Sequence, residues 1–122
     1  MIRPTLAVDL DGVIHRYSGG WRDGSIYDEP MPGALAGLRE LYRRGYDIVI
    51  HTARTDFDEI RRWIVMWDNK EFPNQEMYPF RVTNIKPPAM AYIDDRAVLF
   101  TSWEALLFEF SEPSTEVLRA SS

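Results

Sequence analysis

Apolar residues along this chain fall into short continuous runs and longer segments with helical spacing. Continuous runs rich in β-branched residues are typical of strands buried on both faces. Four such runs are present: TLAVDL (5–10), YDIVIHT (46–52), PFRVTNIKPP (79–88) and AMAYIDD (89–95). AVLF (97–100) is a shorter fifth. Apolar residues at helical spacing predict three helices, within 32–45, 55–70 and 101–110.

Residues at the edges of these segments indicate where the helices begin and end. Pro32 suits the start of the first helix and Gly45 its end, because proline is preorganised for a first turn and glycine for the residue after the last. Thr55 and Asp58 have the spacing of a capping box at the start of the second helix. Strands and helices therefore alternate along the chain.

This alternation predicts an α/β fold: a single Rossmann-like three-layer domain with a mainly parallel sheet and helices on both faces. We expect the domain to span 1–110. A segment rich in Gly, Pro and Asp, at about 14–30, predicts a long loop or flap, and loops of that length are usually functional. The polar residues 111–122 predict a frayed tail.

Composition narrows the chemistry that this domain can support. The chain of 122 residues has no cysteine and only two histidines, which excludes thiolate chemistry and argues against a zinc site. A metal ion here should be a hard cation bound by oxygen, such as Mg²⁺. The net charge of −5 argues against a general nucleic-acid binder.

The chain also lacks the apolar segments that direct a protein to a membrane. No stretch approaches the ~20 apolar residues of a membrane span. The start, MIRPTLAVDLDG, has no apolar core of signal-peptide length before its acidic residues. We therefore expect a cytoplasmic protein with no membrane partner.

Polar residues follow four of the predicted strands. In a parallel α/β sheet, ligands bind beyond the carboxyl ends of the strands, so residues at these ends are the candidate site. They are Asp9 and Asp11, then Thr52, then Lys86, then Asp94 and Asp95. Carboxylates from the first and fourth strands can bind Mg²⁺, and a hydroxyl and an ammonium group can hold an anion beside it.

These groups match the requirements of phosphoryl transfer, which are neutralisation of the phosphate oxygens and a nucleophile. Without cysteine, and without a Ser–His arrangement, an aspartate is the natural nucleophile. The second carboxylate, two residues on, can supply and remove protons.

Four motifs, in this order along the chain, resemble those of the haloacid-dehalogenase superfamily of phosphohydrolases. They are DLDG, HTAR, NIKP and IDD, and the resemblance spans residues 5 to about 100. The family signature is a DxD at the first strand, a Thr or Ser at the second, a Lys, and a terminal acid pair. The resemblance implies a phosphoric monoester hydrolase, and the second acid of DLDG favours a phosphatase over a dehalogenase.

The resemblance assigns the acidic residues their roles. It implies that Asp9 attacks phosphorus to form an aspartyl-phosphate, and that Asp11 protonates the leaving oxygen and then activates water. Mg²⁺ would be bound by Asp9, Asp94 and the backbone carbonyl of Asp11, and Asp95 would support or share that role.

The same resemblance places the phosphoryl group against Thr52, Ala53 and Lys86. Arg54 belongs to the same motif, and two roles remain open for it: contact with a substrate phosphate, or an ion pair with an acid. His15, Arg16 and Trp21 lie on the flap, where substrate contact and solvent exposure are both open.

The gaps between the motifs leave no room for a cap domain, so the chain resembles capless members of the family. We expect the flap to close the site in a monomer or weak dimer. The substrate would be a phosphorylated small molecule or a nucleic-acid end, with a nucleotide or oligonucleotide end the leading candidate. Alternatives are a small sugar-phosphate phosphatase whose lid comes from a neighbouring subunit, and a non-catalytic phosphate-binding or receiver-like module.

Overall fold

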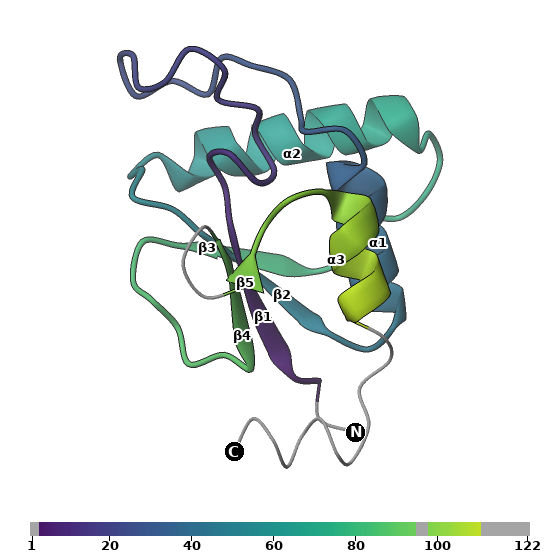
Figure 1. The fold of residues 1–122 in the computed structure, drawn as a ribbon. Helices are drawn as coiled ribbons and strands as arrows, with labels where there is room; N and C mark the ends of the chain where they lie inside the picture. Colours follow the sequence, from purple (N-terminus) through teal and green to yellow (C-terminus); the bar gives the residue numbers. More distant parts are fainter. Residues whose placement is uncertain (1–2, 95–97, 111–122) are drawn as a thin grey trace.

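A computed structural model describes residues 3–94 and 98–110 of the chain. In these residues, five parallel strands form one sheet. Their order across the sheet is β3-β2-β1-β4-β5 (Figure 1), and each neighbouring pair is parallel. Their bounds are β1 Thr5–Asp9, β2 Asp47–His51, β3 Phe80–Thr83, β4 Ala91–Asp94 and β5 Val98–Leu99. The predicted strands and their parallel arrangement are confirmed.

Three helices occur in the described residues: α1 Ala34–Arg43, α2 Phe57–Glu71 and α3 Trp103–Glu109. Gly45 follows α1 with φ 109°, a left-handed conformation that glycine adopts without steric cost. The cap of α2 differs from the prediction: Asp56, not Thr55, is the N-cap, and its carboxylate accepts a hydrogen bond from the backbone N–H of Glu59 at 3.0 Å. An aspartate carboxylate is a strong helix cap, which explains the shift by one residue.

All three helices lie against one face of the sheet. Alternate strand residues share a buried apolar cluster with residues of every helix: Leu6, Val8, Ile48, Ile50, Phe80 and Ile93 from the strands, and Leu38, Leu41, Ile60, Ile64, Trp103 and Leu106 from the helices. Figure 1 shows α1 and α3 side by side at the right of the sheet, with α2 crossing above. The core therefore lies between this face and the helices.

The opposite face differs from the expected three-layer arrangement. In the described residues it carries the segment 84–90, which links β3 to β4 and lies away from α1 and α3 in Figure 1. The Tyr92 hydroxyl donates a hydrogen bond to the Pro87 carbonyl at 2.5 Å and holds this segment on the sheet. The single Rossmann-like domain with a parallel sheet stands as predicted, but within residues 3–94 and 98–110 the helices cover only one face. The link between β3 and β4 is too short, and contains two prolines, to form a crossover helix on the other face.

The order of the strands positions the candidate site. From β1 the chain moves to β2 and β3 on one side, and it then returns to β4 on the other side of β1. Crevices for ligands form at such a reversal, beyond the carboxyl ends of the strands. Asp9 ends β1 and Asp94 ends β4, so both acids lie at this reversal. Residues 10–33 and 52–79, both fully described, hold no inserted domain, as the capless prediction requires.

Candidate functional site

A cavity of about 320 Å³ lies at the carboxyl ends of β1 and β4. Four of the residues predicted from the strand ends line it: Asp9, Asp11, Lys86 and Asp94. Ala53, which the resemblance assigned to phosphate binding, also lines it, together with Ala7, His51, Tyr92 and Ile93. A larger cavity, of about 630 Å³, lies between α1 and the segment 72–79, but none of the strand-end acids lines it. The smaller cavity is therefore the candidate active site.

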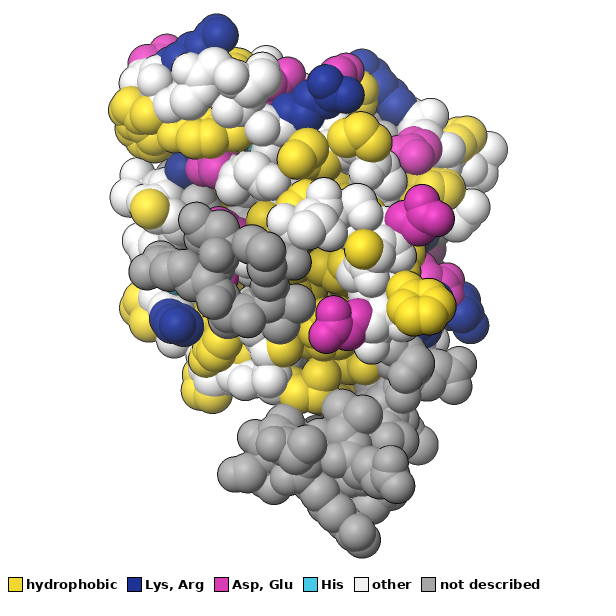
Figure 2. Space-filling view, in the orientation of Figure 1, with side chains coloured by type: hydrophobic (Ala, Val, Ile, Leu, Met, Phe, Trp, Pro, Cys, Tyr) yellow, Lys and Arg dark blue, Asp and Glu magenta, His cyan; other side chains and the backbone are white. Residues whose placement is uncertain are grey.

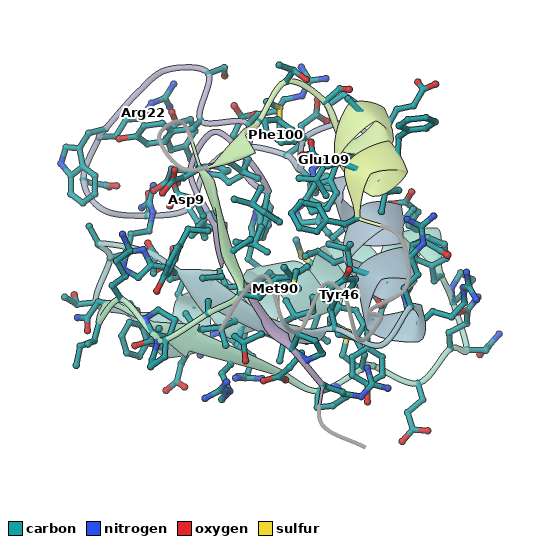
Figure 3. The ribbon with its side chains drawn as sticks, turned by 60° about the horizontal axis from the view of Figure 1, so that its bottom comes forward. Asp9, Arg22, Tyr46, Met90, Phe100 and Glu109 are labelled. Carbon is teal, nitrogen blue, oxygen red and sulfur yellow. The ribbon has the colours of Figure 1, made fainter. Side chains whose placement is uncertain are left out.

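Asp9 is the last residue of β1, and its side chain lines the cavity. Its Oδ1 accepts a hydrogen bond from the backbone N–H of Leu10 at 3.1 Å, which orients the carboxylate at the strand end. In Figure 3, Asp9 lies toward the end of the molecule that carries Arg22 of the flap. Met90 and Tyr46, which precede β4 and β2, lie farther from that end. Asp9 thus faces the crevice rather than the amino ends of the strands.

Asp11 is held by two side chains. The Nδ1 atom of His15 lies 2.8 Å from Asp11 Oδ1, and the Arg54 guanidinium donates from Nε to Oδ2 at 3.0 Å and from Nη2 to Oδ1 at 3.1 Å. Burial raises the pKa of Asp11, but the hydrogen bonds from His15 and Arg54 outweigh it and leave the pKa below its usual value. The resting side chain is therefore a carboxylate.

His15 is fully buried and joins Asp11 to the flap. Its Nε2 accepts a hydrogen bond from the backbone N–H of Asp28 at 3.0 Å. Because Nε2 acts as an acceptor, we assign the ring proton to Nδ1, which donates it to Asp11. The sequence left this role unseen: Val13 and Ile14 precede His15, but the Gly-rich and Pro-rich segment that follows it gives no sign that the ring itself is buried.

Of the two roles left open for Arg54, contact with a substrate phosphate or an ion pair with an acid, the structure shows the ion pair, with Asp11. Besides Asp11, its Nη1 donates to the carbonyls of Gly24 at 2.6 Å and Ser25 at 3.1 Å, and the residue is 5% exposed. Its guanidinium carbon lies 5.3 Å from the ring centroid of Trp21. Arg54 links the flap to Asp11 and does not line the cavity. Its predicted contact with a substrate phosphate stays a prediction.

Thr52 and Lys86, the other predicted phosphate ligands, are placed differently from each other. Thr52 is buried, and its hydroxyl accepts a hydrogen bond from the backbone N–H of Arg54 at 3.0 Å, so it shapes the loop beneath the cavity. Lys86 lines the cavity, with Nζ 4.3 Å from the ring centroid of Tyr92. The structure brings the lysine, but not the threonine, to the cavity wall.

The donor set around the cavity consists of oxygen atoms. The carboxylates of Asp9 and Asp94 line it, and Asp95 lies outside the described residues. Within 3–94 and 98–110, no group of three or more His, Asp or Glu side chains is arranged to hold a metal ion. Mg²⁺ commonly takes only one or two protein carboxylates and completes its shell with water and substrate phosphate. The chemistry of Asp9 and Asp94 therefore fits Mg²⁺.

The predicted flap contains no helix or strand between residues 16 and 29 and is anchored at several points. Its base closes through the bridge between His15 and Pro30. From α2, Glu59 accepts a hydrogen bond from the Ile26 N–H at 2.7 Å, and the Trp63 indole N–H donates to the Asp28 carbonyl at 3.0 Å. The flap thus rests on α2, close to the linked pair Asp11 and Arg54.

Among the described helices, none combines the length and the apolar character needed to cross a membrane. No protein-family model matches this chain, and no curated protein matches it. Its fold is similar to the solved structure of a conserved protein from Bacteroides thetaiotaomicron, with a TM-score of 0.57 and 23% sequence identity. The similarity covers 86% of this chain and 87% of that chain, and it supports the single Rossmann-like α/β domain.

Proposed function

We propose that this protein is a Mg²⁺-dependent phosphatase of the haloacid-dehalogenase type, which hydrolyses a phosphate monoester through an aspartyl-phosphate. The observation that carries the proposal is the cavity at the strand reversal, where Asp9, Asp11, Lys86 and Asp94 meet. These four residues come from three separate motifs, each with the residue type that the chemistry requires at its place.

In this proposal the side chains divide the proton transfers and the charge neutralisation. An Asp9 oxygen attacks phosphorus and the bond from phosphorus to the leaving oxygen breaks. Asp11 takes up the proton of the singly protonated phosphate ester as it binds and passes that proton to the leaving oxygen. The Asp11 carboxylate then accepts a proton from water as that water attacks phosphorus and releases Asp9. The Lys86 ammonium neutralises the phosphoryl oxygens. Asp9 and Asp94, with the Asp11 carbonyl, would hold Mg²⁺, which supplies further charge neutralisation when bound.

His15 and Arg54 act on Asp11 rather than on the substrate. Together they occupy both Asp11 oxygens and fix its rotamer at the edge of the cavity. A carboxylate held in one orientation needs less rearrangement when a water or a leaving oxygen arrives. They are positioning residues in this mechanism.

The test is hydrolysis of a chromogenic aryl phosphate by the purified protein, with Mg²⁺ and with excess EDTA. We expect turnover that EDTA abolishes and Mg²⁺ restores, and we expect Asp94→Ala to require more Mg²⁺ than Lys86→Ala for half-maximal rate. Asp58→Asn, an exposed acid on α2, is the matched control. Absence of turnover on a broad panel of phosphate esters, with phosphate binding retained, would instead identify a non-catalytic phosphate-binding module.

A further inference from the structure

A second cavity, of about 500 Å³, adjoins the candidate active site, and we call it the basic groove. It lies at the edge strand β3, where Arg61 of α2 lines it from the helix side and Val49, Arg81 and the segment 85–88 line it from the other side. Its lining includes Val49, Arg61, Arg81, Ile85, Lys86 and Pro88. Lys86 also lines the active-site cavity, so the two spaces share a wall.

Strand register gives the separation between the two spaces. Ala7 of β1 pairs with Val49 of β2, and Val49 pairs with Arg81 of β3, so the three residues point to the same face. Ala7 lines the active-site cavity, whereas Val49 and Arg81 line the groove. Two strand spacings, about 10 Å, therefore separate the Cα atoms of Ala7 and Arg81. A molecule the size of a nucleotide can occupy both spaces.

The charge of the groove is opposite to that of the whole chain. Arg61, Arg81 and Lys86 line it, and none of its described lining residues is acidic, although the chain has a net charge of −5. On the face drawn in Figure 2, by contrast, acidic and basic side chains of the described residues are interspersed. Three cations around one hollow favour an anionic ligand.

The two arginines can accept such a ligand at low cost. Arg61 is held by its Nη2 hydrogen bond to the Phe80 carbonyl at 3.1 Å and by the Phe80 ring, whose centroid lies 4.4 Å from its guanidinium carbon. Arg81 forms an ion pair at 2.9 Å with Asp47, which does not line the groove. The Arg81 side chain is 65% exposed and the Asp47 side chain 34%. Exposed ion pairs contribute little stability, so a phosphate can replace or share this partner.

Apart from Thr83, the remaining described lining of the groove is apolar. Val49 lies at its floor, 1% exposed, and Pro88 and Ile85 contribute the accessible surface; Ile85 is 75% exposed although it is a large aliphatic residue. A flat, weakly polar ring can cover such a surface while charged substituents reach the arginines. A nucleoside combines that ring with phosphate groups.

We infer that the basic groove is a subsite for a second phosphate, so that the substrate is a nucleotide with two phosphate groups. One phosphate, to be hydrolysed, lies in the cavity with Asp9, and the other lies against Arg61 and Arg81 with the nucleoside along Ile85 and Pro88. That the bound nucleotide is a substrate rests on the proposed function, whereas its binding in the groove does not. A nucleoside bisphosphate and a terminally phosphorylated oligonucleotide both supply this chemistry.

Binding is measured first, by calorimetry in EDTA, so that turnover plays no part. Deoxyadenosine 3′,5′-bisphosphate is compared with the 5′-monophosphate and the 3′-monophosphate. We expect the bisphosphate to bind about tenfold tighter than either, because it gains charge-assisted hydrogen bonds. The double variant with Arg61→Gln and Arg81→Gln should lose that preference, and Arg43→Gln, on α1, should keep it. Equal affinities for all three ligands, or a preference that survives the double variant, would overturn the subsite.

Kinetics with Mg²⁺ then identify the source of the second phosphate. The double variant should lower kcat/KM about tenfold more for a two-phosphate substrate than for an aryl phosphate. The bisphosphate and a terminally phosphorylated trinucleotide are assayed side by side, and the one with the larger arginine-dependent kcat/KM is the better substrate. Arginine-dependent binding without any turnover contradicts the phosphatase and keeps the subsite. Turnover of both substrates with no arginine dependence contradicts the subsite and keeps the phosphatase.

Discussion

Replacement of His15 by phenylalanine separates the packing of this buried side chain from its hydrogen bonds. The His15 ring is fully buried and lies 5.2 Å from Tyr27 and 5.5 Å from Trp63, measured between ring centroids. A phenylalanine ring fills nearly the same space, so these contacts persist. Both hydrogen bonds are lost, the one to Asp11 and the one from the Asp28 N–H.

The structure gives the size of the expected loss. A donor left unsatisfied away from solvent, such as the Asp28 N–H, costs about 1–3 kcal/mol. The hydrogen bond to the Asp11 carboxylate is worth about 1.5–3 kcal/mol, although Arg54 remains to compensate part of that charge. The greater hydrophobicity of phenylalanine offsets about 1 kcal/mol. We therefore expect His15→Phe to lower the free energy of unfolding by about 3 kcal/mol.

Urea unfolding measures this loss as a lower midpoint at an unchanged slope. Tyr27→Phe is the matched control on the same flap, because it removes only the partly exposed hydroxyl that bonds to the Gly20 carbonyl and the Gly19 N–H. The control should lose about 1 kcal/mol or less. A loss below 1 kcal/mol for His15→Phe, or equal losses for both variants, would refute a flap closed over His15.

Two further predictions concern single carboxylates. The Ser18 hydroxyl, with the backbone N–H groups of Ser18 and Glu29, lowers the pKa of Asp28 from 3.8 to about 2. The contribution of Asp28 to stability is therefore present above about pH 4 and is lost as the pH falls toward about 2, and Asp28→Asn should flatten the fall in unfolding free energy over that range. Asp68→Ala should lower the free energy of unfolding in urea by about 3–5 kcal/mol, because the Asp68 side chain is 1% exposed and its loss leaves Arg39 without its carboxylate partner. The control Asp58→Ala, on the exposed face of α2, should cost under about 1 kcal/mol.

Much of the fold could be predicted because its strands are apolar on both faces and its helices are apolar on one. The position of all the described helices on one face could not, because it depends on a link between β3 and β4 that is too short for a helix. Pro87 and Pro88 in this link disfavour a helix, whereas the general rule for parallel sheets predicts one. The basic groove lies where the face opposite the helices meets the edge strand β3.

The candidate site shows the same division. Asp9, Asp11, Lys86 and Asp94 follow predicted strands, so the rule for strand ends was sufficient to bring them to one cavity. The burial of His15 depends on contacts with α2 and with the far side of the flap, and no local pattern encodes those contacts.

The same holds for Arg54. Its motif left two roles open, and the choice of Asp11 depends on where the flap carbonyls lie. Long-range contacts of a loop are decided by the folded structure rather than by the spacing of residues.

The most direct test of the account is the rate of Mg²⁺-dependent phosphate ester hydrolysis by Asp9→Asn relative to the unaltered protein. The substitution keeps the size of the side chain, and equal urea midpoints for both proteins would establish that folding is retained. If Asp9 is the nucleophile, kcat/KM should fall by about 10³-fold or more, while Asp58→Asn retains the full rate. A rate for Asp9→Asn within about tenfold of the unaltered protein would contradict the assignment of Asp9 and, with it, the proposed mechanism.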